Sequence, residues 1–169
     1  LEAYETPADI LYYGGQAGGG KTDLLCGIAQ TEHYSSAIIR RSGTELHTLV
    51  DRSKDIARAY DPKFKFNGSP PAQLTTVDNR KITFFSCHAP GDERAHQGKP
   101  HDFLGFDEIT HFLEIQFKWF MGWLRSTDRR VTRKRVICAG NPPTDPVEGQ
   151  WVKAYWGPWL DENHPNPAN

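Results

Sequence analysis

The chain has 169 residues, of which 37% are hydrophobic and 24% are charged, and 20 Lys and Arg against 21 Asp and Glu leave a net charge of −1 at pH 7. This length and composition are typical of one globular domain with its own core. Because the chain has no overall positive charge, any contact with nucleic acid must come from a local basic patch. No apolar stretch approaches the roughly 20 residues of a membrane span, so we expect no membrane association.

An apolar run, Ile10–Tyr13, predicts a strand that leads into a glycine-rich segment. From Gly15 to Thr22 this segment reads G-x-x-x-x-G-K-T, the phosphate-binding loop of P-loop NTPases. Glycines let backbone N–H groups turn toward a phosphate, the lysine adds positive charge there, and the threonine hydroxyl can ligate Mg²⁺. The helical spacing of the next apolar residues disfavours the alternative of a flexible glycine turn. The predicted nucleotide-binding residues are Gly15, Gln16, Ala17, Gly18, Gly19, Gly20, Lys21, Thr22 and Asp23.

The rest of the chain alternates between strand and helix patterns. Residues 37–40 predict a buried strand, Thr44 is a candidate cap for the following helix, and residues 64–71 predict a turn or loop. We then expect a β-hairpin of residues 73–77 and 81–87, a polar loop over 88–101, a strand over 103–106, one long helix over 109–124, a strand over 135–139 and a short helix over 151–156. This order predicts an α/β fold with a mostly parallel central sheet, flanking helices and a β-hairpin insertion.

Two acids, Asp107 and Glu108, follow the apolar strand of residues 103–106, the pattern of a Walker B element. The carboxyl ends of parallel strands meet at one edge of a sheet, so these acids are expected beside the phosphate loop. Asp107 is then placed to hold Mg²⁺ together with Thr22, and Glu108 to orient or deprotonate an attacking water. The alternative is that both acids only stabilise the start of the next helix.

A third element, Ala139-Gly-Asn-Pro-Pro143, follows the strand of residues 135–139. If this strand lies between the two others, the Asn141 amide faces the γ-phosphate and its water. The alternative is a plain Asn-Pro turn.

Together these segments resemble the ATPase domain of the large terminase subunit of tailed bacteriophages, the motor that packages DNA. The resemblance rests on Tyr13-Gly-Gly-Gln-Ala-Gly-Gly-Gly-Lys-Thr22, on Phe106-Asp-Glu-Ile-Thr-His-Phe112, and on Ala139-Gly-Asn-Pro-Pro143 followed by Gly149-Gln-Trp-Val-Lys153. It implies a P-loop NTPase of the additional-strand (ASCE, RecA-like) type, with the Asn141 strand between the phosphate-loop strand and the Asp107 strand. It also implies that ATP and Mg²⁺ bind at Lys21, Thr22 and Asp107.

By the same resemblance, Glu108 is the catalytic carboxylate and Asn141 belongs to a motif that couples hydrolysis to movement. The implied partners are double-stranded DNA, a homo-oligomeric ring at the portal, the portal protein and the small terminase subunit, all in the host cytoplasm. The sequence departs from the family pattern because the variable loop positions carry no arginine. Family members also often carry an arginine shortly before the Walker B strand that reaches the nucleotide of a neighbouring subunit. Gln97 stands at the matching position here, and Arg94 is the nearest arginine. Arg94 is therefore a candidate arginine finger that acts on a neighbouring subunit, and the alternative is a solvated loop arginine.

Residues 1–160 are interpreted as the ATPase domain and residues 161–169 as a polar linker toward a nuclease domain. Only 28 residues follow Asn141, too few for such a domain, so we expect no nuclease activity from this chain. A basic cluster at Arg125, Arg129, Arg130, Arg133, Lys134 and Arg135 either contacts DNA phosphates or is a solvated turn. Two other functions stay open: a nucleotide-binding switch or assembly module without turnover, and a small-molecule P-loop kinase.

Overall fold

A seven-stranded sheet forms the centre of the protein in a computed structural model that describes residues 2–15, 18–161 and 163–165. The strands are β1 (Ile10–Tyr13), β2 (Ser35–Arg40), β3 (Lys65–Asn67), β4 (Gln73–Thr75), β5 (Lys81–Ser86), β6 (Phe103–Asp107) and β7 (Arg135–Ala139). The helices are α1 (Glu2–Glu5), α2 (Lys21–Thr31), α3 (Gly43–Tyr60), α4 (Glu114–Met121) and α5 (Gln150–Leu160), with short 3-10 helices η1 (Asp92–His96) and η2 (Ile109–His111).

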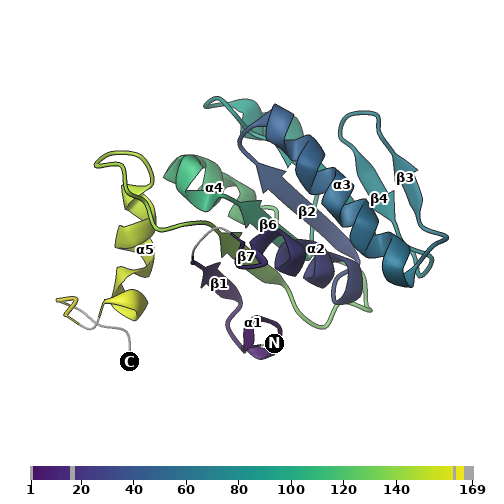
Figure 1. The fold of residues 1–169 in the computed structure, drawn as a ribbon, viewed down its shortest axis with the longest axis horizontal. Helices are drawn as coiled ribbons and strands as arrows, with labels where there is room; N and C mark the ends of the chain where they lie inside the picture. The colour runs from purple at the N-terminus through teal and green to yellow at the C-terminus, as the bar shows by residue number, and fades with distance from the viewer. Residues whose placement is uncertain (1, 16–17, 162, 166–169) are drawn as a thin grey trace.

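The strand order is β1-β7-β6-β2-β5-β4-β3 (Figure 1). Neighbouring strands from β1 to β5 are parallel, and the β5-β4-β3 edge is antiparallel. This confirms the predicted mostly parallel sheet and its hairpin insertion. It also confirms that the strand before Asn141 lies between the phosphate-loop strand and the strand that ends in Asp107.

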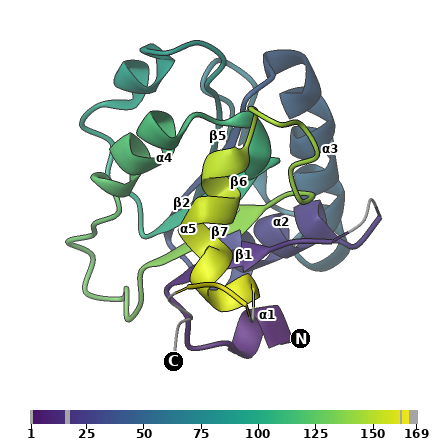
Figure 2. The ribbon, with the colours of Figure 1, turned by 90° about the vertical axis from the view of Figure 1, so that its left-hand side faces the viewer.

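Helices cover both faces of the sheet (Figure 2), with α2 and α3 on one side and α4 and α5 on the other. The alternation of side chains along each strand builds the two cores. In β2, Ile38 belongs to the cluster under α2 and α3, whereas Ala37 and Ile39 belong to the cluster under α4 and α5. All three are fully buried, as expected for a central strand of a parallel sheet.

The predicted long helix over residues 109–124 is wrong. Of its apolar residues, Ile109, Phe112, Phe117 and Phe120 are buried as expected, whereas Leu113 is exposed. Ile109–His111 is a 3-10 turn, Phe112 and Leu113 are extended, and α4 begins only at Glu114. Tertiary hydrogen bonds hold this interruption: the Trp151 indole N–H donates to the Phe112 carbonyl at 2.7 Å. Apolar spacing alone does not reveal such a break, because both pieces bury the same face.

Two smaller predictions also fail. The cap of α3 is Ser42, whose Oγ accepts from the Glu45 N–H at 3.5 Å, whereas Thr44 lies inside the helix. In the predicted loop of residues 64–71, Lys65–Asn67 pairs with β4 as the edge strand β3. Its residues are all exposed, so no buried face marks it in the sequence.

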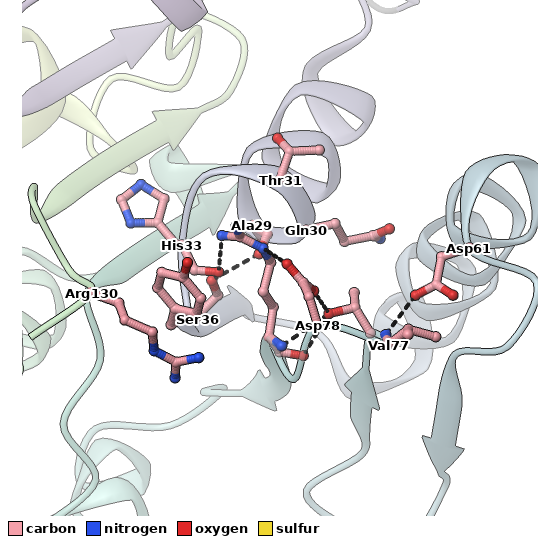
Figure 3. Close-up of polar contacts among 12 residues, drawn as sticks. Ala29, Gln30, Thr31, His33, Ser36, Asp61, Val77, Asp78 and Arg130 are labelled. Carbon is pink, nitrogen blue, oxygen red and sulfur yellow. Dashed lines mark hydrogen bonds and ion pairs between the residues drawn. The ribbon is translucent and has the colours of Figure 1, made fainter. Parts of the chain in front are cut away.

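Polar groups at the amino-terminal end of the sheet pair with one another (Figure 3). The Val77 N–H donates to Asp61 at 2.8 Å, and Arg80 donates to Asp78 at 2.6 Å. The guanidiniums of Arg80 and Arg130 both contact the Tyr34 ring, at 4.3 and 4.1 Å from its centroid.

Four of the six residues of the predicted basic cluster make side-chain contacts within the fold. The Arg125 guanidinium lies 4.5 Å from the centroid of the Trp123 ring. Arg133 donates to the carbonyls of Thr6 and Ala8, and Arg135 donates to those of Ala3 and Tyr4. Arg130 pairs with Asp128 at 2.6 Å. Arg133 and Arg135 therefore fix the segment before β1 to the start of β7, a structural role that neither interpretation of the cluster included.

Candidate nucleotide-binding and hydrolysis site

The carboxyl ends of β1, β7, β6 and β2 meet at one edge of the sheet. The phosphate loop follows β1, Asn141 follows β7, and Asp107 ends β6. In parallel sheets this edge is where ligands collect, because loops and helix N-termini with unpaired N–H groups converge there.

The phosphate loop has the backbone that its glycines predict. Gly15, Gly18 and Gly20 have positive φ of 133°, 83° and 71°, and Gly20 directly precedes the first turn of α2. A Cβ added at any of the three would meet nothing within 4 Å, so glycine is needed there for backbone conformation and not for space. Gln16 and Ala17, also predicted to bind nucleotide, lie outside the described residues.

Lys21, the first residue of α2, lies at the centre of this edge and is only 8% exposed. Its Nζ donates to the Gly15 carbonyl and to Asn141 Oδ1, both at 3.0 Å. The structure thus brings together the lysine of the phosphate loop and the asparagine after β7, which are 120 positions apart in the sequence.

A cleft of about 360 Å³ opens here, and its walls are formed by Gly18, Gly19, Gly20, Lys21, Thr22, Asp23, Glu108 and Asn141. A second hollow of about 220 Å³ continues beyond Glu108 and Asn141 toward Asp145 and Glu148. Two larger hollows, of about 580 and 640 Å³, lie beside α3, and neither is lined by the phosphate loop or the strand-end acids. The chemistry of the residues that line the smaller cleft, and not its volume, therefore marks it as the candidate nucleotide site.

Asp107 is 2% exposed, and its only charged contact within 4.0 Å among the described residues is Arg40 at the end of β2. The Arg40 Nη1 lies 3.0 Å from Asp107 Oδ2, but the angle is not that of a hydrogen bond, so this buried oxygen has no hydrogen-bond donor within the described chain. Burial raises the pKa of Asp107 to about 6, against the lowering influence of Arg40. Asp107 does not line the cleft itself, but its carboxylate ends the strand that leads directly into the cleft-lining Glu108, and carboxylate and threonine oxygens are donors that Mg²⁺ prefers.

Glu108 has a left-handed backbone, with φ of 56° and ψ of 58°. This conformation costs on the order of 1–3 kcal/mol in a residue other than glycine, and such strain concentrates at functional sites. It turns the chain at the end of β6 so that Glu108 lines both the main cleft and the adjoining hollow.

Two of the predicted site residues, Asp23 and Arg94, do not lie at the centre of the cleft. Asp23 lines the cleft, but its carboxylate forms a bidentate ion pair with Arg52 of α3, at 2.6 and 2.7 Å. The hydrogen bonds from Arg52 lower the pKa of Asp23. Arg94 is exposed in η1 and is not among the residues that line the cleft of its own chain.

Sequence reasoning missed Arg40. Its guanidinium contacts Asp107 and also donates to Glu45 at 3.1 Å. A signal was present, because Arg40 ends the predicted strand of residues 37–40, which pairs in parallel with the Asp107 strand. The ends of parallel neighbours meet at one edge of the sheet, and this holds for the cation as well as for the acids.

The phosphate loop on β1, the acid pair on β6 and the strand β7 inserted between them define a P-loop NTPase of the additional-strand type. A family comparison gives the particular family. Residues 20–169 match the family model described as terminase large subunit, T4likevirus-type, N-terminal, and the chain belongs to this family. A search of curated protein sequences gave no match.

Several solved structures with a similar fold come from bacteriophage large terminases and from a bacteriophage DNA packaging ATPase. The large terminase from a thermophilic bacteriophage, in complex with ATP-gamma-S, has a TM-score of 0.59 at 13% identity over 82% of this chain and 34% of its own. The HK97 bacteriophage large terminase has a TM-score of 0.56 at 12% identity over 83% of this chain and 31% of its own. The N-terminal domain of the DNA packaging ATPase from bacteriophage phi29 has a TM-score of 0.56 at 13% identity, over 88% of this chain and 78% of its own.

At these identities the likeness concerns the fold. The chain spans about a third of the length of the thermophilic-phage and HK97 large terminases, but most of the phi29 domain. Among the described residues, no helix is both long and apolar enough to cross a membrane.

Proposed function

We propose that this chain is the ATPase part of a DNA-packaging motor, which hydrolyses ATP with Mg²⁺ to move viral double-stranded DNA into a procapsid. The observation that carries the proposal is the meeting of Lys21, Asn141 and Glu108 in one cleft at the phosphate loop, with Asp107 at the end of the strand that leads to Glu108. Membership of the terminase family supports the DNA-packaging role.

In this proposal the N–H groups of the phosphate loop and the Lys21 ammonium bind the β- and γ-phosphates of ATP. Thr22 and Asp107 are the residues that would hold Mg²⁺, which would supply positive charge to the phosphate oxygens. Arg40 keeps the Asp107 carboxylate directed toward this position. Because Lys21 already contacts Asn141, a γ-phosphate that reaches Lys21 also meets the Asn141 amide.

Glu108 acts as the general base. Its carboxylate accepts a proton from a water molecule while the water oxygen attacks the γ-phosphorus, and the bond between this phosphorus and the β–γ bridging oxygen breaks to release ADP. Its position between the main cleft and the adjoining hollow gives water a place next to the γ-phosphate.

The proposed assembly is a homo-oligomeric ring at the portal, with DNA, the portal protein and the small terminase subunit as partners in the host cytoplasm. Arg94 is exposed, and we propose that it completes the site of a neighbouring subunit, where such a guanidinium raises turnover on the order of 10³-fold or more.

Phosphate release from Mg-ATP, measured against protein concentration, tests this function. The specific activity of the unmodified chain is expected to rise with protein concentration. Arg94→Ala should abolish the activity of the concentrated sample. Binding of ATP without phosphate release at any concentration would instead identify a switch or assembly module, and ADP formed without free phosphate in the presence of an acceptor would identify a kinase.

A further inference from the structure

Two adjacent tyrosines end β1, and their side chains lie on opposite faces of the sheet. Tyr12 packs against the core under α4 and α5, whereas Tyr13 packs against the core under α2 and α3. Each carries its hydroxyl to a different loop of the site. The Tyr13 hydroxyl donates to the Gly19 carbonyl of the phosphate loop at 3.3 Å. The Tyr12 hydroxyl donates to the Gly140 carbonyl, in the loop that follows β7, at 3.2 Å.

Strand β1 thus holds both backbone polar groups of Gly140. The carbonyl accepts from the Tyr12 hydroxyl, and the N–H donates to the Tyr13 carbonyl at 3.4 Å. The next residue is Asn141, whose side chain accepts from Lys21 at 3.0 Å. Because a peptide unit is planar, fixing the Gly140 carbonyl also fixes the peptide N–H of Asn141 and limits where its side chain can reach.

Gly140 is also packed against the backbone that carries Glu108. A Cβ added at Gly140 would lie 3.2 Å from the Ile109 nitrogen and 3.6 Å from the Glu108 Cα. Tightly packed backbone segments transmit displacement, so a shift of Gly140 moves Glu108. Burial, and then the Glu108 charge, raise the pKa of the Tyr12 phenol, so its hydroxyl remains a donor at neutral pH.

Helix α5 contacts the same unit from outside. The Trp156 ring lies 5.4 Å from the Tyr12 ring, centroid to centroid, and is 6% exposed. The first turn of α5 adjoins the segment after Glu108, because a Cβ added at Gly149 would lie 2.8 Å from the Thr110 carbonyl oxygen. Figure 2 shows α5 lying across β1, β7 and β6.

We propose that Tyr12 is a positioning residue for hydrolysis: its hydroxyl holds the Gly140–Asn141 peptide so that Asn141 and Glu108 keep their places relative to Lys21. Through the Trp156 contact, Tyr12 also carries any displacement of this peptide to α5. This inference rests on the proposed function. Tyr13 differs, because its hydroxyl braces the loop that binds phosphate and not the loop that follows β7.

The two tyrosines are matched controls for each other, since Tyr12→Phe and Tyr13→Phe each remove one hydroxyl from neighbouring positions. Steady-state phosphate release should show kcat about 10-fold lower in Tyr12→Phe with KM for ATP unchanged, which corresponds to about 1.4 kcal/mol of lost transition-state stabilisation. Tyr13→Phe should mainly raise KM. A kcat of Tyr12→Phe within two-fold of the unmodified chain, or equal kcat and KM changes in both variants, would overturn the inference.

A double-mutant cycle separates positioning from general weakening of the fold. In a chain that already carries Asn141→Ala, Tyr12→Phe should lower kcat by clearly less than 10-fold, because one of the two groups that it positions is gone. A full 10-fold further loss would show that Tyr12 acts independently of Asn141 and would contradict the proposal.

A binding measurement keeps the inference separate from the proposed function. Binding of ATP-gamma-S should change tryptophan fluorescence, and the part of this change that Trp156→Phe removes should also disappear in Tyr12→Phe but persist in Tyr13→Phe. If the unmodified chain releases no phosphate, the proposed function fails while this signal still decides the role of Tyr12. An unchanged Trp156 signal in Tyr12→Phe would refute the relay.

Discussion

Two buried aspartates flank the same central strand, and their surroundings differ. Asp102 directly precedes β6 and is fully buried, and its carboxylate accepts from the Tyr34 and Ser35 N–H groups at 3.0 and 2.9 Å. Asp107 ends β6 and is 2% exposed, yet one of its oxygens has only the Arg40 charge beside it. A carboxylate satisfied by backbone donors supports the fold, whereas one left partly unsatisfied is available to a ligand.

The two ends of the sheet also hold different kinds of polar group. At the amino end, Asp61 and Asp78 pair with backbone groups or with Arg80 (Figure 3), although the buried His33 Nδ1, His101 Nε2 and Arg135 Nε have no hydrogen-bond partner among the described residues. At the carboxyl end lie a strained glutamate, a partly unsatisfied aspartate and a glycine loop with three positive φ angles. The amino end is therefore expected to respond to mutation in stability, and the carboxyl end in activity.

The largest expected effect is at Glu108. Glu108→Gln keeps the side-chain size but removes the base, so phosphate release should fall by about 10²- to 10⁴-fold while nucleotide affinity stays within a few-fold. Steady-state kinetics and nucleotide titration measure the two quantities. Glu114→Gln is the control, because Glu114 lies at the start of α4 in an exposed ion pair with Lys118, and its activity should be unchanged. Equal losses in both variants would remove Glu108 from the chemistry.

Substitution of the two aspartates should have opposite effects, with Asp102→Asn lowering stability and Asp107→Asn lowering activity. Asp102→Asn places an amide N–H₂ where two backbone N–H groups need an acceptor, and should lower the free energy of unfolding by about 1–3 kcal/mol. Asp107→Asn should change it by less than about 1 kcal/mol, because a costly buried charge is removed, but should abolish Mg-dependent hydrolysis. Urea unfolding and phosphate release measure both properties. Greater destabilisation by Asp107→Asn would reverse the comparison.

Acidification should weaken the amino end through His33. Burial, reinforced by the charges of Arg135 and Arg133, lowers the pKa of this 3%-exposed ring from 6.5 to about 4. As the pH falls, His33 therefore binds a proton in the unfolded chain before it does so in the folded chain. The contribution of His33 to the free energy of unfolding is fully present above pH 6.5 and is lost as the pH falls toward 4. From pH 7 to 5 the free energy of unfolding should fall by roughly 2 kcal/mol more than in His33→Gln. Asp107 and His101 titrate both in the unmodified chain and in His33→Gln, so they do not affect the difference between the two. If the free energy of unfolding depends on pH in the same way in both chains, His33 is not the cause.

The smallest effect is expected at Asp23, which lies at the carboxyl end of the sheet but whose carboxylate is already paired with Arg52. Both partners of its ion pair with Arg52 are about half exposed, so Asp23→Asn should lower the free energy of unfolding by about 0.5 kcal/mol. Nucleotide affinity should change less than two-fold in a titration at moderate salt. A ten-fold loss of affinity would show that the carboxylate itself contacts the ligand.

Local patterns predicted most of the fold because they depend on neighbours in the chain. The apolar run in residues 37–40 and the helical spacing after Lys21 each gave the correct element, although the strand begins two residues earlier, at Ser35. The failures occurred where a long-range contact overrides the local pattern. The Trp151 hydrogen bond to Phe112 stabilises the interruption before α4, and pairing with β4 turns exposed residues 65–67 into a strand.

The sequence by itself determined the candidate chemistry: a glycine loop with Lys21 and Thr22, an acid pair at 107 and 108, and an asparagine at 141. These motifs are readable because each is a short run whose spacing is set by the local backbone. Only the tertiary structure decided which groups meet: Arg40 with Asp107, Lys21 with Asn141, and Tyr12 with Gly140, the last pair 128 positions apart. The physical reason is the strand order, which brings distant segments to one edge of the sheet and which no local pattern encodes.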